Sequence, residues 1–342
     1  MIKYLSLTAV FAALLFCSCT KEDQGAAITS STNPSAILLP KASTTFEAFS
    51  TVKVNYGALI GTPDQANSLN FQLNVANEVG VSCLRSRTLV PGNGKVPILN
   101  RQYQILLNFN GNYQGTPLPF VSDITKYQSD LKKILSGFTT MPVVAVIENE
   151  ESNTLFYSGT PQEYISQLTA AITVMHAYGI KVANGGITST GLNYLVYQDF
   201  MSQGKVDSAK DFQQRAKLAI KNAKTQDRGA FVNALLEAYT QMDLDYVNFH
   251  WKATSPDTQA LYEVISYLKK RTGKAVISNE LGQFDTDPNT LTSHVQMCTD
   301  RGFPYIIWYS PDEHAEKKGT PLQHSDQSLT NTGIAYKNYL QN

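Results

Sequence analysis

The feature of this sequence that most constrains its fold is an alternation of short apolar segments with longer segments of helical periodicity, repeated eight times. The clearest apolar segment, residues 143–147, has five apolar residues in a row, which is typical of a strand buried on both faces of a parallel sheet. Eight strands that alternate with helices are typical of one closed barrel, so the sequence predicts the α/β class and a single (β/α)8 TIM barrel. The predicted strands are residues 52–56, 81–85, 104–109, 143–147, 179–183, 246–249, 274–278 and 305–308.

Predicted helices fill most of the connections between these strands, but one connection differs. Residues 88–101 contain Pro91, Gly92, Gly94 and Pro97 and have no helical period, so we expect the second helix to be missing, short or replaced by a loop. An open, doubly wound sheet is the structural alternative, although no GxGxxG or P-loop motif supports a nucleotide-binding version of it. Helices are predicted at residues 63–78, 123–137, 161–178, 256–272, 288–301 and 331–340, with two more in 208–243 that break near Gly229.

The N-terminal residues resemble an export signal. Lys3 precedes an almost unbroken apolar stretch at residues 5–16, which is too short to span a bilayer as a permanent helix. Residues 15–19 resemble the lipobox of bacterial lipoproteins, which implies that Cys19 carries a lipid, with Cys17 as the second choice; an ordinary secretory signal is the alternative. We therefore predict a signal peptide at 1–18, a flexible tether at 19–45, a (β/α)8 domain at 46–342, and a location in the cell envelope.

The charge balance and the cysteine pattern argue against several classes of partner. The chain has 28 basic and 28 acidic side chains, and this neutrality argues against a nucleic-acid partner and against a polybasic membrane surface. Cys83 and Cys298 belong to no CxxC pattern, which argues against a zinc or redox site. We expect two buried free thiols, with a disulfide as the alternative. We expect no metal, no other cofactor, and a monomer that reaches the membrane through its lipid.

Polar and aromatic side chains directly follow several predicted strands, at the ends that would meet at one mouth of a barrel. Glu148, Asn149, Glu150 and Glu151 follow residues 143–147, and a solvated acidic loop would explain them as well as a site would. Each other strand end is also ordinary alone, because a single Arg, His or Trp more often pairs or packs than binds a ligand. Their recurrence on five strands predicts a ligand site. The other four ends carry Arg85 and Arg87, His250 and Trp251, Glu280, and Trp308 and Tyr309.

These strand ends resemble the clan A glycoside hydrolases, which are retaining enzymes with catalytic glutamates on strands four and seven of a (β/α)8 barrel. Asn149-Glu150 resembles the Asn-Glu pair of strand four, and Glu280-Leu281-Gly282 resembles the Glu-aromatic-Gly motif of strand seven. The resemblance covers most of residues 50–342 and leaves the family within the clan open. Further matches are 79–85 with strand two, 245–251 with strand six, Trp308 with the Trp of strand eight, and 331–336 with the closing helix.

The resemblance implies a hydrolase that cleaves O-glycosidic bonds of a poly- or oligosaccharide with retention. It implies that Glu150 is the acid/base and Glu280 the nucleophile. It further implies that Arg85 keeps Glu280 ionised, that Asn149 binds the sugar 2-hydroxyl, and that His250 orients a catalytic carboxyl or the substrate. Trp308 is implied as the floor of the sugar subsite, and weaker candidates for flanking subsites, for which packing is an equal explanation, are Trp251, Tyr309, Phe284 and Tyr157.

Two alternatives to a retaining hydrolase stay open. The first is a glycan-binding barrel lipoprotein without turnover, which differs from the enzyme in the placement of Glu150 and Glu280: an enzyme needs them to face each other across the mouth. The second is a barrel enzyme of another chemistry, such as an aldolase. It lacks support, because we expect no strand-end Lys suited to a Schiff base and no His/Asp cluster suited to a metal.

Overall fold

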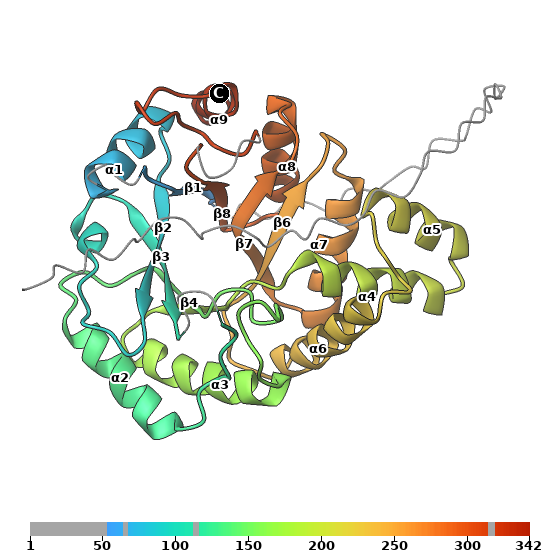
Figure 1. Cartoon of the computed structure of the whole chain (residues 1–342), viewed down its shortest axis with the longest axis horizontal. Coiled ribbons are helices and arrows are strands. Elements are labelled where there is room, and N and C mark those ends of the chain that lie inside the picture. The colour runs from blue at the N-terminus through green and yellow to red at the C-terminus, as the bar shows by residue number, and fades with distance from the viewer. Residues whose placement is uncertain (1–52, 64–67, 112–115, 314–318) are drawn as a thin grey trace, which may run out of the picture.

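Eight parallel strands close into a barrel in the order in which they occur along the chain. Figure 1 shows the strands at the centre of the molecule. This computed structural model describes residues 53–63, 68–111, 116–313 and 319–342, so the predicted signal peptide, the tether and Cys19 lie outside it. The predicted (β/α)8 barrel is confirmed. The strands are β1 (Asn55–Ile60), β2 (Cys83–Leu89), β3 (Gln104–Asn110), β4 (Val144–Ile147), β5 (Lys181–Asn184), β6 (Tyr246–Ala253), β7 (Ala275–Gln283) and β8 (Tyr305–Ser310).

Helices surround the barrel on its outer side (Figure 1). Between β2 and β3 the structure has the short 3-10 helix η1 (Pro97–Asn100), which confirms that the second helix of the repeat is reduced. Within the described residues, no helix is both long and apolar enough to cross a bilayer. The α-helices are α1 (Ser68–Val79), α2 (Ile124–Ser136), α3 (Pro161–Ala177), α4 (Ser189–Ser202), α5 (Val206–Arg215), α6 (Ala223–Tyr239), α7 (Gln259–Thr272), α8 (Pro288–Asp300) and α9 (Asn331–Gln341).

The prediction was wrong in the connection between β5 and β6. Helix α4 was not predicted, because the glycines at 185, 186 and 191 around its start are typical of a loop. The break near Gly229 was also wrong: α6 runs through Gly229, and a Cβ there would overlap the ring of Tyr194 on α4. This glycine therefore permits two helices to approach closely, and the real break falls between α5 and α6.

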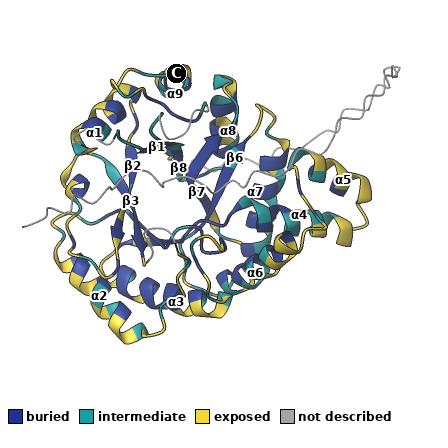
Figure 2. Cartoon of the chain, viewed as in Figure 1, coloured by how far each residue is buried: buried dark blue, intermediate teal, exposed yellow. Residues whose placement is uncertain are grey.

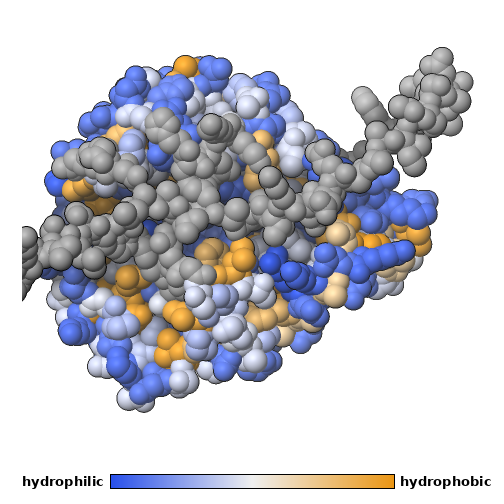
Figure 3. Space-filling model, viewed as in Figure 1, coloured by the Kyte–Doolittle hydropathy of each residue, from blue (hydrophilic) through white to orange (hydrophobic). Residues whose placement is uncertain are grey.

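Buried apolar residues form two clusters, which we place in an inner layer, inside the barrel, and an outer layer, between the strands and the helices. Figure 2 shows that the strands are largely buried and that the helices have buried and exposed faces. Cys83 is fully buried in the inner layer and Cys298 in the outer one, and both are free thiols, as predicted. Successive residues of a strand alternate between the layers. The buried inner residues are Cys83, Leu106, Val144, Val146, Ala183, Ile277 and Ile307. The molecular face in Figure 3 is largely hydrophilic, with its apolar residues in separate groups.

Candidate active site

The backbone at the end of β4 separates the acidic residues that follow it. Glu148 and Glu150 both have left-handed backbones, with φ of 69° and 52°, a conformation that is uncommon outside glycine. As a result, Asn149 and Glu150 contact groups at the mouth of the barrel, whereas Glu148 and Glu151 contact residues of the outer, helical layer. All three glutamates are buried, so the alternative of a solvated acidic loop is excluded.

A β-bulge in β7 places two consecutive side chains in the barrel mouth. Between Ile277 and Glu280 the chain advances three residues, while β6 advances two from Asn248 to His250. The same extra residue appears against β8. Asn279 and Glu280 therefore both bond to inward-facing groups, although neighbours on a regular strand point to opposite faces.

Cations surround the Glu280 carboxylate. Arg85 Nη1 lies 2.6 Å from Oε2 of Glu280, and Lys252 Nζ lies 3.5 Å from Oε1. Burial alone would raise the pKa of Glu280, but the nearby charges of His250, Lys252 and Arg85 outweigh burial and hold that pKa well below its usual range. Glu280 is therefore an ionised, buried carboxylate at neutral pH.

Glu150 is held by neutral or titratable partners instead. Its Oε1 lies 3.0 Å from His250 Nδ1, and its Oε2 accepts a hydrogen bond of 2.7 Å from Asn153 Nδ2. The same Nδ1 of His250 lies 3.8 Å from Glu280 Oε2. One oxygen of Glu150, one nitrogen of His250 and one oxygen of Glu280 all lie within 4.8 Å of one another, so the two carboxyls face each other across the mouth.

Arg85 also joins the two strand ends to each other. Its Nη2 donates to Oδ1 of Asn149 at 2.6 Å, while its Nη1 donates to Glu280. Arg87, two residues further along β2, is exposed. The structure thus brings together Arg85, Asn149, Glu150, His250 and Glu280.

The other predicted site residues divide between the mouth and the core. On β8 and β6 the alternation turns Tyr309 toward Lys252, whose ammonium lies 3.5 Å from the centre of the Tyr309 ring. Trp308 and Trp251 belong instead to the outer apolar layer, and the Trp308 indole N–H donates to the Thr320 carbonyl at 2.9 Å. Trp308 is fully buried and offers no ring face to a sugar, contrary to the role implied for it.

The two remaining aromatic candidates are Tyr157 and Phe284. Tyr157 stacks on Phe120 with ring centres 4.7 Å apart, and its hydroxyl donates to Glu148. Phe284 is half-buried, and its backbone N–H donates to the Ala253 carbonyl.

Sequence reasoning missed Lys252, Asn279 and Asn108. Lys252 follows His250 by two residues, so strand alternation alone could have placed it in the mouth. The ammonium of this strand-end lysine lies 3.5 Å from the Glu280 carboxylate. Asn279 could not have been found this way, because a regular strand with Glu280 inside would turn it outward.

Glu150, His250 and Glu280 form a group of possible metal ligands, although we expected none in the sequence. The positive charge already at this site disfavours a cation. Arg85 and Lys252 already contact the Glu280 carboxylate, so a divalent ion would face two positive charges at close range.

Glu148 and Glu151 form a second acidic region, behind the mouth. Glu148 accepts hydrogen bonds from the Gly111 backbone, from Tyr157 and from Gln167. Glu151 Oε1 accepts from Asn184 at 2.7 Å and from Tyr239 at 3.1 Å. Burial raises the pKa of both carboxyls, that of Glu151 to about 7.

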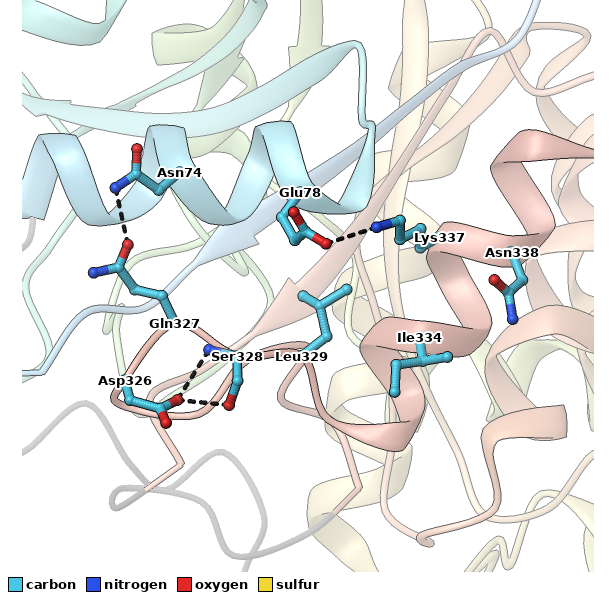
Figure 4. A pocket seen from close by; sticks show the side chains of 9 residues that line it. All are labelled: Asn74, Glu78, Asp326, Gln327, Ser328, Leu329, Ile334, Lys337 and Asn338. Carbon is cyan, nitrogen blue, oxygen red and sulfur yellow. Dashed lines mark hydrogen bonds and ion pairs between the residues drawn. The ribbon is translucent and has the colours of Figure 1, made fainter.

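A separate surface hollow lies between α1, α9 and the loop that precedes α9 (Figure 4). Glu78 and Lys337 form an ion pair of 2.6 Å there, and Asn74 donates to Gln327. Its polar groups thus bond to one another, and we assign it no role in the site.

No family model and no curated protein sequence matches this chain. Solved structures do match it in fold. An endo-β-1,3-glucanase of family GH128, subgroup II, from Sorangium cellulosum has a TM-score of 0.55 at 13% identity, covering 83% of this chain and 97% of its own. A mutant subgroup I endo-β-1,3-glucanase from Amycolatopsis mediterranei, in complex with laminarihexaose, has a TM-score of 0.53 at 9% identity, covering 84% and 99%.

A third match is an exo-β-1,3-glucanase of GH128 subgroup VI from Aureobasidium namibiae, with a TM-score of 0.52 at 13% identity, covering 84% of this chain and 97% of its own. At these identities the likeness establishes a shared barrel fold. The chain spans nearly the whole of each matched protein.

Proposed function

We propose that this protein is a glycoside hydrolase that cleaves O-glycosidic bonds with retention, using Glu150 as acid/base and Glu280 as nucleophile. One observation carries the proposal: two buried carboxyls, one just after β4 and one on β7, have oxygens within 4.8 Å of each other, and they have different partners. Retaining glycosidases hold their carboxyls about 5–5.5 Å apart, whereas inverting enzymes leave room for a water between them.

In the first step, Glu280 attacks the anomeric carbon while Glu150 protonates the departing oxygen. Arg85 and Lys252 keep Glu280 ionised and therefore nucleophilic. Asn149 accepts from Arg85 through Oδ1, which leaves Nδ2 as the atom able to donate to a sugar hydroxyl. The products of this step are a glycosyl ester of Glu280 and a leaving sugar that carries the proton from Glu150.

In the second step, a water attacks the ester and Glu150 takes its proton. The C–O bond to Glu280 breaks, and the carboxylate regains its negative charge between Arg85 and Lys252. Those two cations lose their counter-charge while the ester exists, so they favour its cleavage. Lys252 is thus expected to act mainly in the second step.

For the substrate, we propose a β-1,3-glucan. The support is the likeness of the barrel to β-1,3-glucanases, together with a mouth that combines a carboxyl pair with hydrogen-bonding side chains. The Tyr309 ring faces this mouth beside Lys252 and is the aromatic residue best placed to contact a sugar, in place of Trp308.

The decisive experiment follows hydrolysis of a panel of glucans and aryl glycosides by NMR. We expect release of reducing ends from laminarin or curdlan, with the β-anomer formed first. First appearance of the α-anomer would exclude retention. Binding of the oligosaccharides without any release would favour the alternative of a glycan-binding barrel.

The proposed location is the cell envelope, with a lipid on Cys19. Expression of the full chain in a bacterial host, followed by membrane fractionation and mass spectrometry of the N-terminal peptide, tests this. Cys19→Ala should release the protein from the membrane, and Cys17→Ala is the matched control that should remain bound. The opposite result would move the lipid to Cys17.

A further inference from the structure

A line of buried amide side chains connects Arg85 to His250 across the floor of the mouth. It passes through Asn108 and Asn279, with Asn248 beside it. The three amides are at most 1% exposed, so their hydrogen bonds are made within the protein. Because an amide has one acceptor and one donor end, its partners determine which way each one points.

The first two members of this line have fixed orientations. Arg85 Nε can only donate, and it lies 3.1 Å from Oδ1 of Asn108. Asn108 Nδ2 in turn donates to the backbone carbonyl of Glu148 at 3.0 Å. The Asn108 oxygen is therefore an acceptor, and the group of Asn279 that lies 3.2 Å from it must be the donor Nδ2.

Asn279 then presents its oxygen to His250. Its Oδ1 accepts from Asn248 Nδ2 at 2.8 Å and lies 2.8 Å from His250 Nε2. The orientation of Asn248 is fixed independently, because its Oδ1 accepts from the Asn279 backbone N–H at 3.0 Å. An acceptor opposite Nε2 requires a hydrogen on Nε2.

With Nε2 protonated, Nδ1 of a neutral His250 carries a lone pair and no hydrogen. This Nδ1 atom lies 3.0 Å from Glu150 Oε1. A carboxylate and a lone pair at that distance repel each other. One proton must therefore lie between the two atoms, either as Glu150 O–H donating to Nδ1 or as an imidazolium N–H donating to the carboxylate.

We propose that Asn279 is a positioning residue that locks His250 in the Nε2–H form, so that His250 Nδ1 and Glu150 share one proton. That this is the proton delivered to the leaving oxygen rests on the proposed function. After delivery, the lone pair and the carboxylate face each other without a proton, so the pair draws one from the water of the second step. Each cycle then returns the shared proton.

Other charged groups also face the His250 ring, from several elements. Glu280 lies 3.8 Å away on β7, Arg85 and Lys252 flank Glu280, and the Glu151 carboxyl interacts with the ring from behind. A Cβ at residue 186 would overlap the His250 ring, so the glycine at this position leaves the space that the ring occupies. These charges affect how readily the shared proton is lost, whereas Asn279 determines which nitrogen faces Glu150.

The test reads the tautomer directly. Two-bond 1H–15N correlation spectra of the full-length protein labelled with 15N-histidine distinguish the ring forms, and the His250 signals are assigned from their loss in His250→Gln. We expect His250 to be the Nε2–H form or imidazolium from pH 5 to 9. Detection of the Nδ1–H form in the wild-type protein would overturn the proposal.

Two variants separate positioning from packing. Asn279→Leu removes the acceptor, so we expect the Nδ1–H form to appear and kcat to fall about 100-fold, the loss expected without general acid catalysis, with KM nearly unchanged. Asn279→Asp keeps an acceptor opposite Nε2 and should keep the Nε2–H form, even if Asn279→Leu fails to fold. An Nδ1–H form in Asn279→Asp, or an unchanged tautomer in folded Asn279→Leu, would assign the lock to another group.

The spectra test the role of Asn279, and the kinetics test the proposed function, so one proposal can be refuted without the other. If no glycan is hydrolysed, the tautomer still tests the role of Asn279. If hydrolysis occurs while His250 has the Nδ1–H form, the proposed function stands and the lock is wrong.

Discussion

Two pairs of buried glutamates lie around the end of β4, and they differ in what surrounds them rather than in how deeply they are buried. Glu150 and Glu280 face the mouth, where Arg85 and Lys252 supply positive charge and His250 lies 3.0 Å from Glu150. Glu148 and Glu151 face the helices, where their partners are neutral amides, hydroxyls and a backbone N–H. The inner pair is suited to exchange protons and charge, whereas the outer pair fastens the β4 loop to the wall of the barrel.

This difference predicts that substitutions in the inner pair reduce turnover, whereas substitutions in the outer pair change the free energy of unfolding. Glu280→Gln removes the nucleophile, and turnover should fall by about 10⁴-fold or more. Azide should partly rescue Glu280→Ala and give a product of inverted configuration. Glu151→Gln is the matched control, with activity within a few-fold of the wild type at pH 6. Near-normal turnover in Glu280→Gln would end the assignment.

Glu150→Gln should reduce turnover by roughly 10²–10⁴-fold with natural leaving groups, because the departing oxygen then lacks its proton. The loss should be far smaller with a dinitrophenyl glycoside, whose leaving group needs no proton. Steady-state kinetics on the two substrates measure this contrast. An equal loss on both would mean that Glu150 does something other than donate a proton.

The outer pair should respond in stability instead. Glu148→Leu leaves Gly111 N–H, Tyr157 and Gln167 without an acceptor, and the free energy of unfolding should fall by about 3–5 kcal/mol. Urea denaturation measures it, and Glu148→Gln, which keeps one acceptor oxygen, should lose less. A loss below about 1 kcal/mol would show that the hydrogen bonds of Glu148 are dispensable.

Glu151 should make stability depend on pH. Its pKa in the folded protein is about 7, above its ordinary value of 4.5, so the folded state binds the proton more tightly than the unfolded chain does. This contribution is complete below about pH 4.5 and is lost as the pH rises to 7. At about 1.4 kcal/mol per pH unit, that interval amounts to roughly 3 kcal/mol.

Glu151→Gln stays neutral and should remove this dependence. Urea denaturation from pH 4 to 8 is expected to show the variant gaining stability relative to the wild type as the pH rises. A constant difference between the two proteins across that range would contradict the assigned pKa.

The smallest expected effect is that of Lys252→Met, about tenfold on kcat. Because Lys252 favours release of Glu280 from the ester, the variant should accumulate the glycosyl-enzyme and show a burst of the first product in rapid-mixing kinetics. Lys252→Arg keeps the charge and is the control. A fall in the first step alone would show that Lys252 acts on the attack by Glu280 or on substrate binding, and not on cleavage of the ester.

Much of the barrel could be predicted because its strands are apolar runs bounded by polar residues, as at residues 143–147. Helix α4 could not, since Gly191, which is required for its contact with Arg228 on α6, reads locally as a loop signal. Strand position predicted that both carboxyls lie at the mouth, and the family resemblance predicted their pairing. Glu150, rather than Glu148 or Glu151, faces the mouth because Glu148 and Glu150 have left-handed backbones. Asn279 turns inward because of the bulge in β7. Neither the left-handed residues nor the bulge could be predicted from the sequence.

Cys83 and Cys298, the free thiols of the described residues, can report separately on the opening of the two apolar layers. Cys83 lies among the side chains that fill the barrel, and Cys298 lies between the barrel and its helices. A thiol reagent can reach each cysteine only when its own layer opens, so the two labelling rates report the opening free energies of the two layers separately. A helix that detaches while the barrel stays closed exposes only Cys298, and unfolding of the whole domain exposes both at the same rate.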